Sequence, residues 1–566
     1  MKSCRSIFAF IIVCFFSYNL YCSEKPDSTT VFSFYSACAT GDYSTAEKFL
    51  LKYPDCANIE LFQDIVEIEN YDHIAYSQFA NFLIGKEIVT FNDDEKDKEK
   101  DWIKSYRRYP INIAARYGNT DIVQLLIKYN ANVELQEEQG YTSLMSAIQN
   151  GHNEIVSILL GIKQDLNKQS NVGTSALMVA ALNGRTEITK KLLEQNVNTD
   201  LRDTTGFSAF MYSVTKGFLD ITKMLLPYTS IDEKTNAGAT AILVASERGD
   251  NDTVSYLLSK GANVNDATKE LLTPLMLASI YNHKEVLKTL LKNKAIIDAK
   301  DDSGSTALMY ACNLGNKDCF DELVKAGANI YEKNNHNDSV LLLAVAGGNV
   351  EIVSELLKNN VDINAINKEQ TTPLYYACSH GKTDVVRELL KHDPDLNIVS
   401  FGNTVFCVAA MNGFEDILNL LMDKDADLGN RKQLMVDVMK PLTTGHPESC
   451  SIILKNKKYA RMFFGFPGTP KLDDLTILMW AARDGNIELA KIILNYDVNV
   501  NYQNSQGATA LILATYNNHL DIVKLLIEAG ADVKLKDNLG MRAINYATIH
   551  KDNPDLLLYL YSFEEE

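Results

Sequence analysis

A segment of about 33 residues recurs along most of this chain of 566 residues. Each copy opens with a Thr or Ser placed before a short apolar run, and the copies are 32 or 33 residues apart. A fixed period of this length is typical of a solenoid, in which each copy buries its apolar face against its neighbours. The opening residues are Thr142, Ser175, Ser208, Thr240, Thr273, Thr306, Ser339, Thr372 and Thr404, and after a break Thr476 and Thr509.

Each copy predicts two short helices. The opening hydroxyl suits the N-cap of a first helix. In most copies Ala follows five residues later, where a small side chain lets helices approach, and Gly or Asn follows nine residues later. Gly and Asn tolerate the left-handed turn that ends a helix. A second apolar stripe, such as Ile155-Val156 with Leu159-Leu160, predicts a second helix. We therefore expect an all-α solenoid of helix-turn-helix units joined by short hairpin-like loops.

Two segments carry a resemblance to a known family. Thr273-Pro274-Leu275-Met276-Leu277-Ala278 and Gly261-Ala262-Asn263-Val264-Asn265 resemble the opening T-P-L-H-x-A and the close G-A-D-V-N of the ankyrin repeat. The resemblance covers residues 107–563 and implies a repeat solenoid that binds proteins on a concave face. Losing the family His removes a hydrogen bond to the adjoining turn, and we expect packing to compensate in part. The residues in the His slot are Met145, Met178, Met211, Met276, Met309 and Met479.

The regularity of the repeat sets the domain boundaries. Between residues 59 and 106 the register is lost and charged residues dominate, which is typical of a solvated loop. A second irregular stretch, with aromatic residues and prolines, follows the long central array. We predict a signal peptide (1–22), a first capping unit (23–58), a charged insertion (59–106), ankyrin repeats (107–429), a degenerate repeat with an aromatic loop (430–475), and repeats with a C-terminal cap (476–563).

Some slots vary from copy to copy and therefore have no fixed packing role. Aromatic and Arg side chains in such slots are candidate anchors for a partner protein. By contrast, we expect Tyr212, Tyr310, Tyr376, Trp480 and Tyr546 in the core, because the family usually places an apolar residue in their slot. The predicted protein-binding residues of the repeats are Tyr141, Phe207, Arg248, Tyr281, Arg483 and Tyr516.

The degenerate repeat adds three more candidates. The segment 462–470 contains Phe463, Phe464 and Phe466 close to two prolines, an unusual composition for a loop. One interpretation is a self-packed loop that covers a weak joint between repeats. The other is a protruding contact for a partner, so we include these three residues in the predicted protein-binding set.

Acidic residues outnumber basic ones by 73 to 55, which gives a net charge of −18. Such a surface repels phosphate backbones, and without a basic stripe the sequence excludes nucleic-acid binding. The charge favours a basic protein partner and binding that weakens with salt. We expect the chain to act as a monomer.

The first 22 residues are typical of a secretory signal: Lys2 and Arg5 precede the apolar run 7–16. That run is shorter than the roughly 20 residues of a membrane span, so we predict an exported protein without an integral span. Cys22 offers an alternative, a lipid-anchored N-terminus. The lack of a regular cysteine framework favours the periplasm over a eukaryotic secretory route, although both stay open.

Motifs for phosphate loops, zinc hydrolases and serine hydrolases are absent from the sequence. We therefore predict no metal and no cofactor, and a binding function instead of catalysis. The alternative is an enzyme domain hidden in residues 59–108 or 430–475, but neither stretch is longer than 50 residues.

Overall fold

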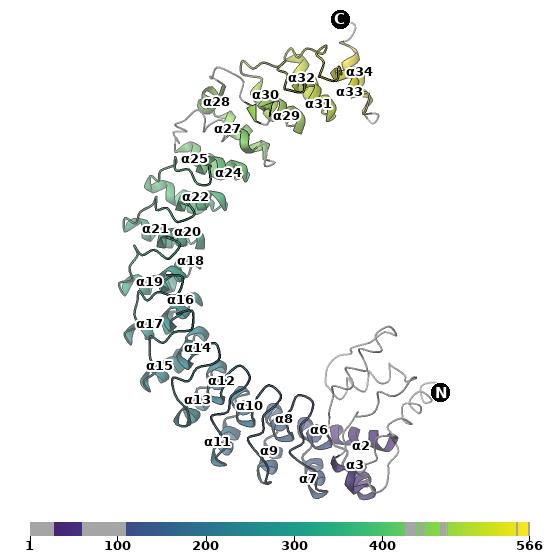
Figure 1. Ribbon diagram of the computed structural model, residues 1–566, viewed down its shortest axis with the longest axis vertical. Helices are drawn as coiled ribbons and strands as arrows, with labels where there is room; N and C mark the ends of the chain where they lie inside the picture. The colour runs from purple at the N-terminus through teal and green to yellow at the C-terminus, as the bar shows by residue number, and fades with distance from the viewer. Residues whose placement is uncertain are drawn as a thin grey trace. The chain divides into compact units, whose positions relative to one another are not determined.

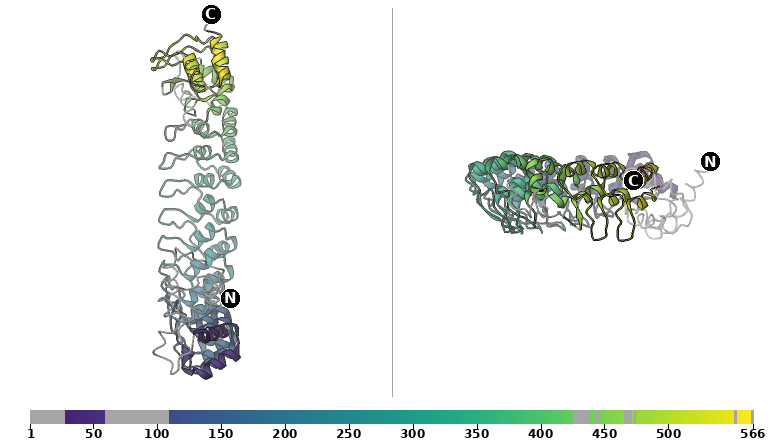
Figure 2. Two further views of the ribbon diagram at one scale, coloured as in Figure 1. Left: turned by 90° about the vertical axis from the view of Figure 1, so that its right-hand side faces the viewer. Right: turned by 90° about the horizontal axis from the view of Figure 1, so that it is seen from above.

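The computed structural model describes residues 28–58, 109–424, 438–441, 446–464, 471–472, 474–550 and 553–563. These residues form successive pairs of short helices, and each loop between pairs projects to the same side within its unit (Figures 1 and 2). The chain divides into two compact units, Met1–Pro274 with Lys292–Ala295, and Leu275–Leu291 with Ile296–Glu566. We call the first helix of each pair the A helix and the second the B helix. The predicted all-α repeat solenoid is confirmed.

In the first unit each A helix is followed by its B helix. The elements are α2 (Ser28–Thr40), α3 (Tyr43–Lys52), η1 (Pro54–Asn58), α6 (Pro110–Tyr117), α7 (Thr120–Lys128), α8 (Ser143–Asn150), α9 (Asn153–Leu160), α10 (Ala176–Leu182), α11 (Thr186–Glu194), α12 (Ala209–Lys216), α13 (Leu219–Leu225), η4 (Leu226–Tyr228), α14 (Ala241–Arg248) and α15 (Asn251–Ser259).

The second unit continues the same alternation and adds an extra helix and a two-stranded hairpin. The elements are α16 (Pro274–Ile280), α17 (Lys284–Lys292), α18 (Ala307–Asn313), α19 (Lys317–Lys325), α20 (Val340–Gly347), α21 (Val350–Lys358), α22 (Pro373–Ser379), α23 (Thr383–Leu389), η5 (Leu390–His392), α24 (Val405–Met411), α25 (Glu415–Asp423), α27 (Pro447–Lys455), α28 (Lys457–Phe464), β1 (Lys471–Leu472), β2 (Leu475–Thr476), α29 (Ile477–Asp484), α30 (Ile487–Ile493), α31 (Ala510–Tyr516), α32 (Leu520–Glu528), α33 (Ala543–Ala547) and α34 (Pro554–Tyr561). Strands β1 and β2 pair antiparallel.

The Thr and Ser residues that open the copies are the N-caps of A helices. The hydroxyl of Ser208 accepts a hydrogen bond from the backbone N–H of Met211 at 3.1 Å, and Thr476 accepts one from Met479 at 3.2 Å. Thr240 departs from this pattern, because it is the N-cap of α14 but makes no side-chain cap bond. A hydroxyl cap like that of Ser208 accepts a hydrogen bond from a backbone N–H that has no partner within the helix.

The glycines after the A helices adopt the left-handed conformation and let the next pair approach closely. Gly485 has a φ of +76°, and a Cβ there would lie 2.7 Å from the ring of His519. The Nε2 atom of His519 is 3.1 Å from the carbonyl oxygen of Arg483, at the end of the preceding A helix. His152 makes the same contact with Arg116 at 2.9 Å. These histidines therefore join neighbouring pairs.

The six methionines in the family His slot are buried, each at most 1% exposed, as expected from packing. In α6 the slot holds Asn112, whose side-chain amide donates to the carbonyl oxygens of Leu135 at 3.3 Å and Tyr141 at 3.1 Å. The hydrogen bond between helix and loop that the methionines cannot make is thus present in this copy.

The first pair stacks directly on the second. The amide of Asn119 donates to the carbonyl oxygens of Cys38 at 2.7 Å and Ala39 at 2.9 Å, and Asn58 accepts from the N–H of Asn132 at 2.5 Å. The charged insertion predicted over 59–106 lies outside the described residues, as does the signal peptide. The described pairs on either side of the insertion are in direct contact with each other.

The degenerate repeat contains an additional helix, α28, where we predicted the start of a loop. Its residues Tyr459, Ala460 and Phe463 are buried. The ring of Tyr459 lies 5.8 Å from that of Phe406 in α24, and the ring of Phe464 stacks on Tyr496 at 4.5 Å. Helix α28 therefore contacts the pairs on both sides of the irregular copy. Residues 465–470 lie outside the described residues.

Candidate protein-binding surface

Exposed apolar side chains recur at or just beyond the C-terminal ends of the A helices and on loop tips. On the A helices these side chains lie seven or eight residues after the N-cap. We name this set the A-face of each unit. In the first unit it comprises Tyr117 (36% exposed), Val172 (55%) and Leu271 (48%); in the second it comprises Tyr281 (49%), Leu314 (49%), Phe401 (65%), Tyr516 (56%), Leu539 (82%) and Ile549 (61%).

Two of the predicted partner residues belong to the A-face, Tyr281 and Tyr516. Tyr141 and Phe207 are half-buried. Burial is the main cause of the raised pKa of Tyr141, and the charge of the neighbouring Glu137 raises it further. The ring of Phe207 packs on that of Tyr212, with 5.4 Å between centroids. These two side chains therefore offer only part of their surface to a partner.

The two predicted arginines bond within the chain. Nη1 of Arg248 donates to the carbonyl oxygen of Thr215 at 3.0 Å and so satisfies an acceptor in the last turn of α12. The guanidinium of Arg483 stacks over the ring of Trp480 at 3.9 Å. It also donates to both carboxylate oxygens of Asp484, at 2.7 and 3.2 Å. Arg248 thus supports the preceding A helix, whereas Arg483 makes these contacts within α29.

The aromatic candidates of the degenerate repeat have different positions. Phe463 is fully buried, so the structure assigns it to the core and not to a contact surface. Phe464 is half-buried between Phe463 and Tyr496. Phe466 lies outside the described residues. The described part of this segment therefore packs on its own chain. Burying the apolar rings against neighbouring elements removes them from water, which is favourable.

The four tyrosines expected in the core are only half-buried. Tyr376 stacks on the ring of His380 at 4.0 Å, and in the other three the hydroxyl reaches a loop carboxylate. The distance from hydroxyl to carboxylate is 2.5 Å in each pair. Burial of Asp203 raises its pKa, but hydrogen bonds from Tyr212, Thr205 and Phe207 more than offset this and leave the pKa below its ordinary value. Each pair ties an A helix to the loop before it. The pairs are Tyr212 with Asp203, Tyr310 with Asp301, and Tyr546 with Asp537. Trp480, at 5% exposure, lies in the core as expected.

Two loop-tip residues of the A-face, Phe401 and Leu271, have backbone conformations that disfavour their residue type. Phe401 has a φ of +51° and Leu271 a φ of +62°. The left-handed conformation costs an L-residue about 1 kcal/mol, and most other residues of positive φ here are Gly or Asn. A bulky exposed side chain kept in such a turn points to a role outside folding. The sequence signal for this exposed Phe was its position directly before Gly402, which is typical of a turn.

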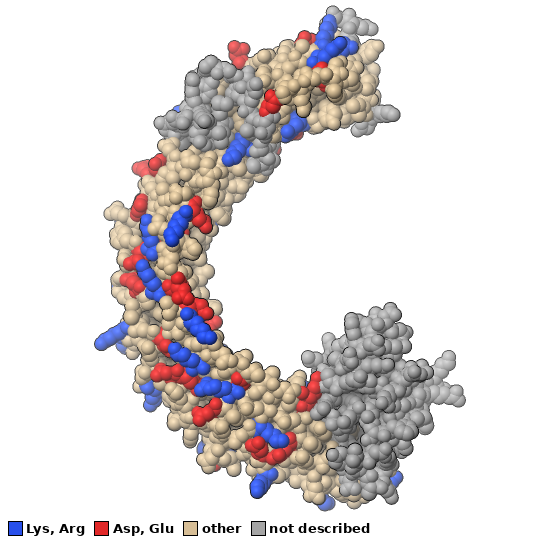
Figure 3. All heavy atoms as spheres, viewed as in Figure 1, with Lys and Arg blue, Asp and Glu red and all other residues tan. Residues whose placement is uncertain are grey.

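Acidic side chains gather on the B helices. Every described B helix from α7 onward carries an exposed Asp or Glu in its first turn, whereas no described A helix does. Such residues stabilise the positive end of a helix dipole. In Figure 3 the edge that the A helices line is mainly uncharged within each unit. Much of the negative charge thus supports helices away from the A-face.

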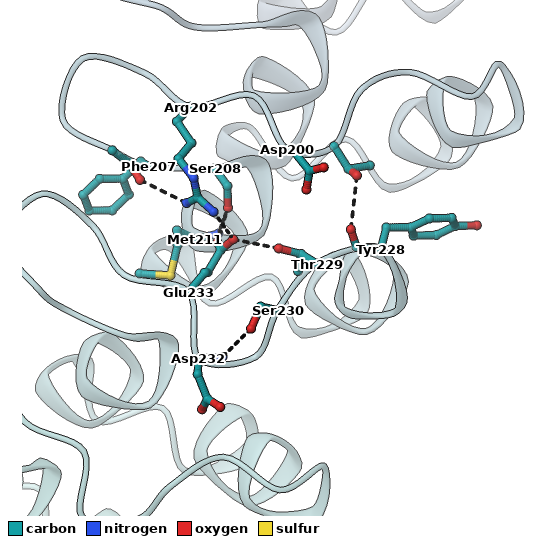
Figure 4. A network of polar contacts seen from close by, with 12 residues as sticks. Asp200, Arg202, Phe207, Ser208, Met211, Tyr228, Thr229, Ser230, Asp232 and Glu233 are labelled. Atoms are coloured by element: carbon teal, nitrogen blue, oxygen red, sulfur yellow. Dashed lines mark hydrogen bonds and ion pairs between the residues drawn. The ribbon is translucent and has the colours of Figure 1, made fainter.

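A buried carboxylate organises one loop of the first unit. The side chain of Glu233 is 2% exposed and lies 2.9 Å from Nη2 of Arg202. It also accepts hydrogen bonds from the hydroxyls of Ser208 and Thr229, the latter at 2.7 Å. Figure 4 shows Arg202, Ser208 and Thr229 directed at Glu233. Because Ser208 also caps α12, this network fixes the loops around that A helix.

Groups suited to chemistry are not clustered in the part of the chain that the structure describes. No three His, Cys, Asp or Glu side chains there lie together as a metal site would require. Burial raises the pKa of the Cys319 thiol to about 12, the neighbouring Asp318 adding to the effect. No described helix is long and apolar enough to cross a bilayer.

A family model described as ankyrin repeats (3 copies) matches residues 73–170, 161–237, 229–301, 294–367, 341–432, 442–537 and 478–564. The chain is 29% identical to an ankyrin repeat-containing protein of Treponema pallidum (strain Nichols) over 150 residues, 26% of this chain and 48% of that protein. It is 40% identical over 85 residues to ankyrin repeat and SAM domain-containing protein 6 of Mus musculus, 15% of this chain and 10% of that protein. It is 30% identical over 186 residues to ankyrin repeat and KH domain-containing protein mask-1 of Caenorhabditis elegans, 29% of this chain and 7% of that protein. The matches therefore span less than half of each relative's length.

Proposed function

Because the chain belongs to the ankyrin-repeat family, whose repeats generally mediate protein–protein interaction, we propose that it is an exported scaffold that binds a partner protein. Binding uses the A-face, and the chain acts as a monomer without catalysis. The observation that carries the proposal is the exposure of Tyr281, Phe401 and Tyr516, at 49%, 65% and 56%. Exposed aromatic side chains of this kind are the usual anchors of interfaces.

The charge distribution supports a basic partner that is attracted over a distance. The exposed acids at the B-helix N-termini create a negative field around the chain, while the A-face supplies mainly aromatic and aliphatic contact area. Long-range attraction of this kind raises the association rate and falls with ionic strength. We therefore expect salt to slow association more than it speeds dissociation.

A pull-down from the extract of the producing organism tests the A-face. With residues 23–566 as bait, we expect a discrete partner whose recovery falls about tenfold or more with Tyr281→Ala or Tyr516→Ala, because anchors of this kind dominate binding energy. Thermal melting should stay the same, since both side chains are largely exposed. Equal recovery with every variant would count against the A-face.

Phe401→Gly sharpens this test because its effects on folding and on binding should differ. Gly adopts a φ of +51° without the steric cost that Phe pays, and this offsets the lost contact with the ring of Tyr375 at 6.1 Å, so the melting temperature should change little. Recovery of the partner should nevertheless fall. A variant that melts normally and loses its partner cannot owe the loss to misfolding.

We further propose that residues 1–22 direct export and are then removed. The observation is the basic start followed by the apolar run 7–16. Mass spectrometry of the native protein should give a chain that begins near residue 23, in the exported fraction. An added acyl mass on Cys22 would instead support the alternative, a lipid-tethered surface protein. An intact N-terminus in the cytosol contradicts both.

A further inference from the structure

A cleft of about 460 Å³ opens in the second unit between α31 and the loop that leads into α33. Its floor is apolar and includes Ile512 and Ala508, which are 4% and 7% exposed. Tyr516 and Tyr546 line its sides, and Leu539 at 82% exposure lies at its rim. The residues that line the cleft include one charged group, the carboxylate of Asp537, and no Lys or Arg.

The two tyrosine rings present aromatic surface to the cleft. Their centroids are 5.6 Å apart and their planes meet at 83°, so the rings are almost perpendicular. Tyr516 is 56% exposed, which leaves much of its ring open to a ligand. The face of an aromatic ring attracts cations, most strongly where water is partly excluded.

The carboxylate of Asp537 is held in place by hydrogen bonds but can accept one more. Oδ1 accepts from the N–H groups of Leu539 and Met541, both at 2.9 Å, and Oδ2 accepts from the Tyr546 hydroxyl at 2.5 Å. Burial raises the pKa of Asp537, but these hydrogen bonds outweigh that effect and keep the pKa below its ordinary value, so the group is ionised at neutral pH. Each carboxylate oxygen can accept two hydrogen bonds, and Oδ2 therefore has room for one more donor.

The preceding A helix of the same unit contains the arrangement that this cleft would form with a ligand. There the guanidinium of Arg483 stacks over Trp480 at 3.9 Å and donates to both oxygens of Asp484. Trp480 and Tyr546 occupy the same slot of their copies. At the cleft the rings and the carboxylate are present, while the lining supplies no cation.

We propose that this cleft binds an arginine side chain of the partner protein. The guanidinium is planar, so it can stack on a tyrosine ring while one of its N–H groups donates to Oδ2 of Asp537; an ammonium cannot stack in this way. Leu539 would contact the aliphatic part of the arginine. The inference rests on the proposed function and names the partner group that one part of the A-face recognises.

Saturation-transfer NMR with the full chain and two pentapeptides tests the cleft. The probes are Gly-Gly-Arg-Gly-Gly and the same peptide with citrulline, which keeps the shape of arginine but is neutral. We expect signal transfer to the arginine side-chain methylenes and binding about tenfold weaker for citrulline, because the charge-assisted contacts are lost. Tyr516→Leu should weaken arginine binding about fivefold, the size of a partly exposed cation–π contact.

Tyr331→Leu is the matched control, since it removes another exposed tyrosine (63% exposed) that belongs neither to the A-face nor to the lining of the cleft. It should leave peptide binding unchanged. Equal binding of the arginine and citrulline peptides, or equal loss in both tyrosine variants, would overturn the inference. A natural partner could still be lost with Tyr281→Ala in that case, so failure here is separable from failure of the proposed scaffold.

Discussion

Replacing Arg202 with Met should lower the free energy of unfolding of the first unit by about 2 kcal/mol, less than for a fully buried pair because the Arg202 side chain is 38% exposed. The carboxylate of Glu233 is 2% exposed and its cationic neighbour, 2.9 Å away, would be gone. The hydroxyls of Ser208 and Thr229 would still donate to it, but they cannot neutralise a buried charge. Urea denaturation followed by circular dichroism measures the loss. Hydrogen exchange should place the weakened amides around α12 and α13, because repeat stacks lose stability locally.

The double variant Arg202→Met with Glu233→Met separates the buried charge from lost packing. Replacing a buried ion pair with apolar side chains of similar volume is often neutral, so this variant should recover most of the stability. If the double variant were as unstable as the single one, the carboxylate would not be the source of the loss, and the aliphatic part of Arg202 would be.

The helix pairs could be predicted because each has its own local signals. A cap such as Ser208 and a left-handed glycine such as Gly485 act within one or two turns, so the sequence pattern alone locates both ends of an A helix. Helix α28 was missed although Tyr459, Ala460 and Phe463 lie at positions i, i+1 and i+4, the spacing of an apolar helical stripe. Because prolines and glycines follow this stripe, the sequence pattern favoured a loop.

The candidate surface was harder to predict, for a physical reason. Variation between copies marks residues without a shared packing role, but a variable residue can still bond to its own neighbour. Arg248 and Arg483 do so, whereas Tyr281 and Tyr516 remain exposed. The opposite error concerns Tyr546, which we expected in the core because its slot is usually apolar. Its hydroxyl needs a hydrogen-bond acceptor and reaches Asp537. Arg248 bonds to a residue 33 positions earlier and Tyr546 to one nine positions earlier, so the apolar pattern of a single helix predicts neither contact.

Phe463→Ala should cost about 3–4 kcal/mol of stability in the second unit, in the range of buried Phe to Ala replacements. Phe463 is fully buried in α28, and its neighbours Tyr459 and Phe464 contact the pairs on either side. The cavity would loosen that contact, so we expect thermal unfolding to separate into two steps, with hydrogen exchange rising first in α27 and α28.

Phe464→Ala is the control, because Phe464 is only half-buried and should cost less than half as much. The pair also decides between the two interpretations of this segment. A stability loss that is larger for Phe463 means that α28 closes a weak joint in the stack. Partner recovery lost in both variants with unchanged melting would mean instead that α28 rearranges to expose its rings. The first outcome is favoured because the rings already have apolar neighbours, and exposing Phe463 would forfeit roughly 2–3 kcal/mol of burial before any contact formed.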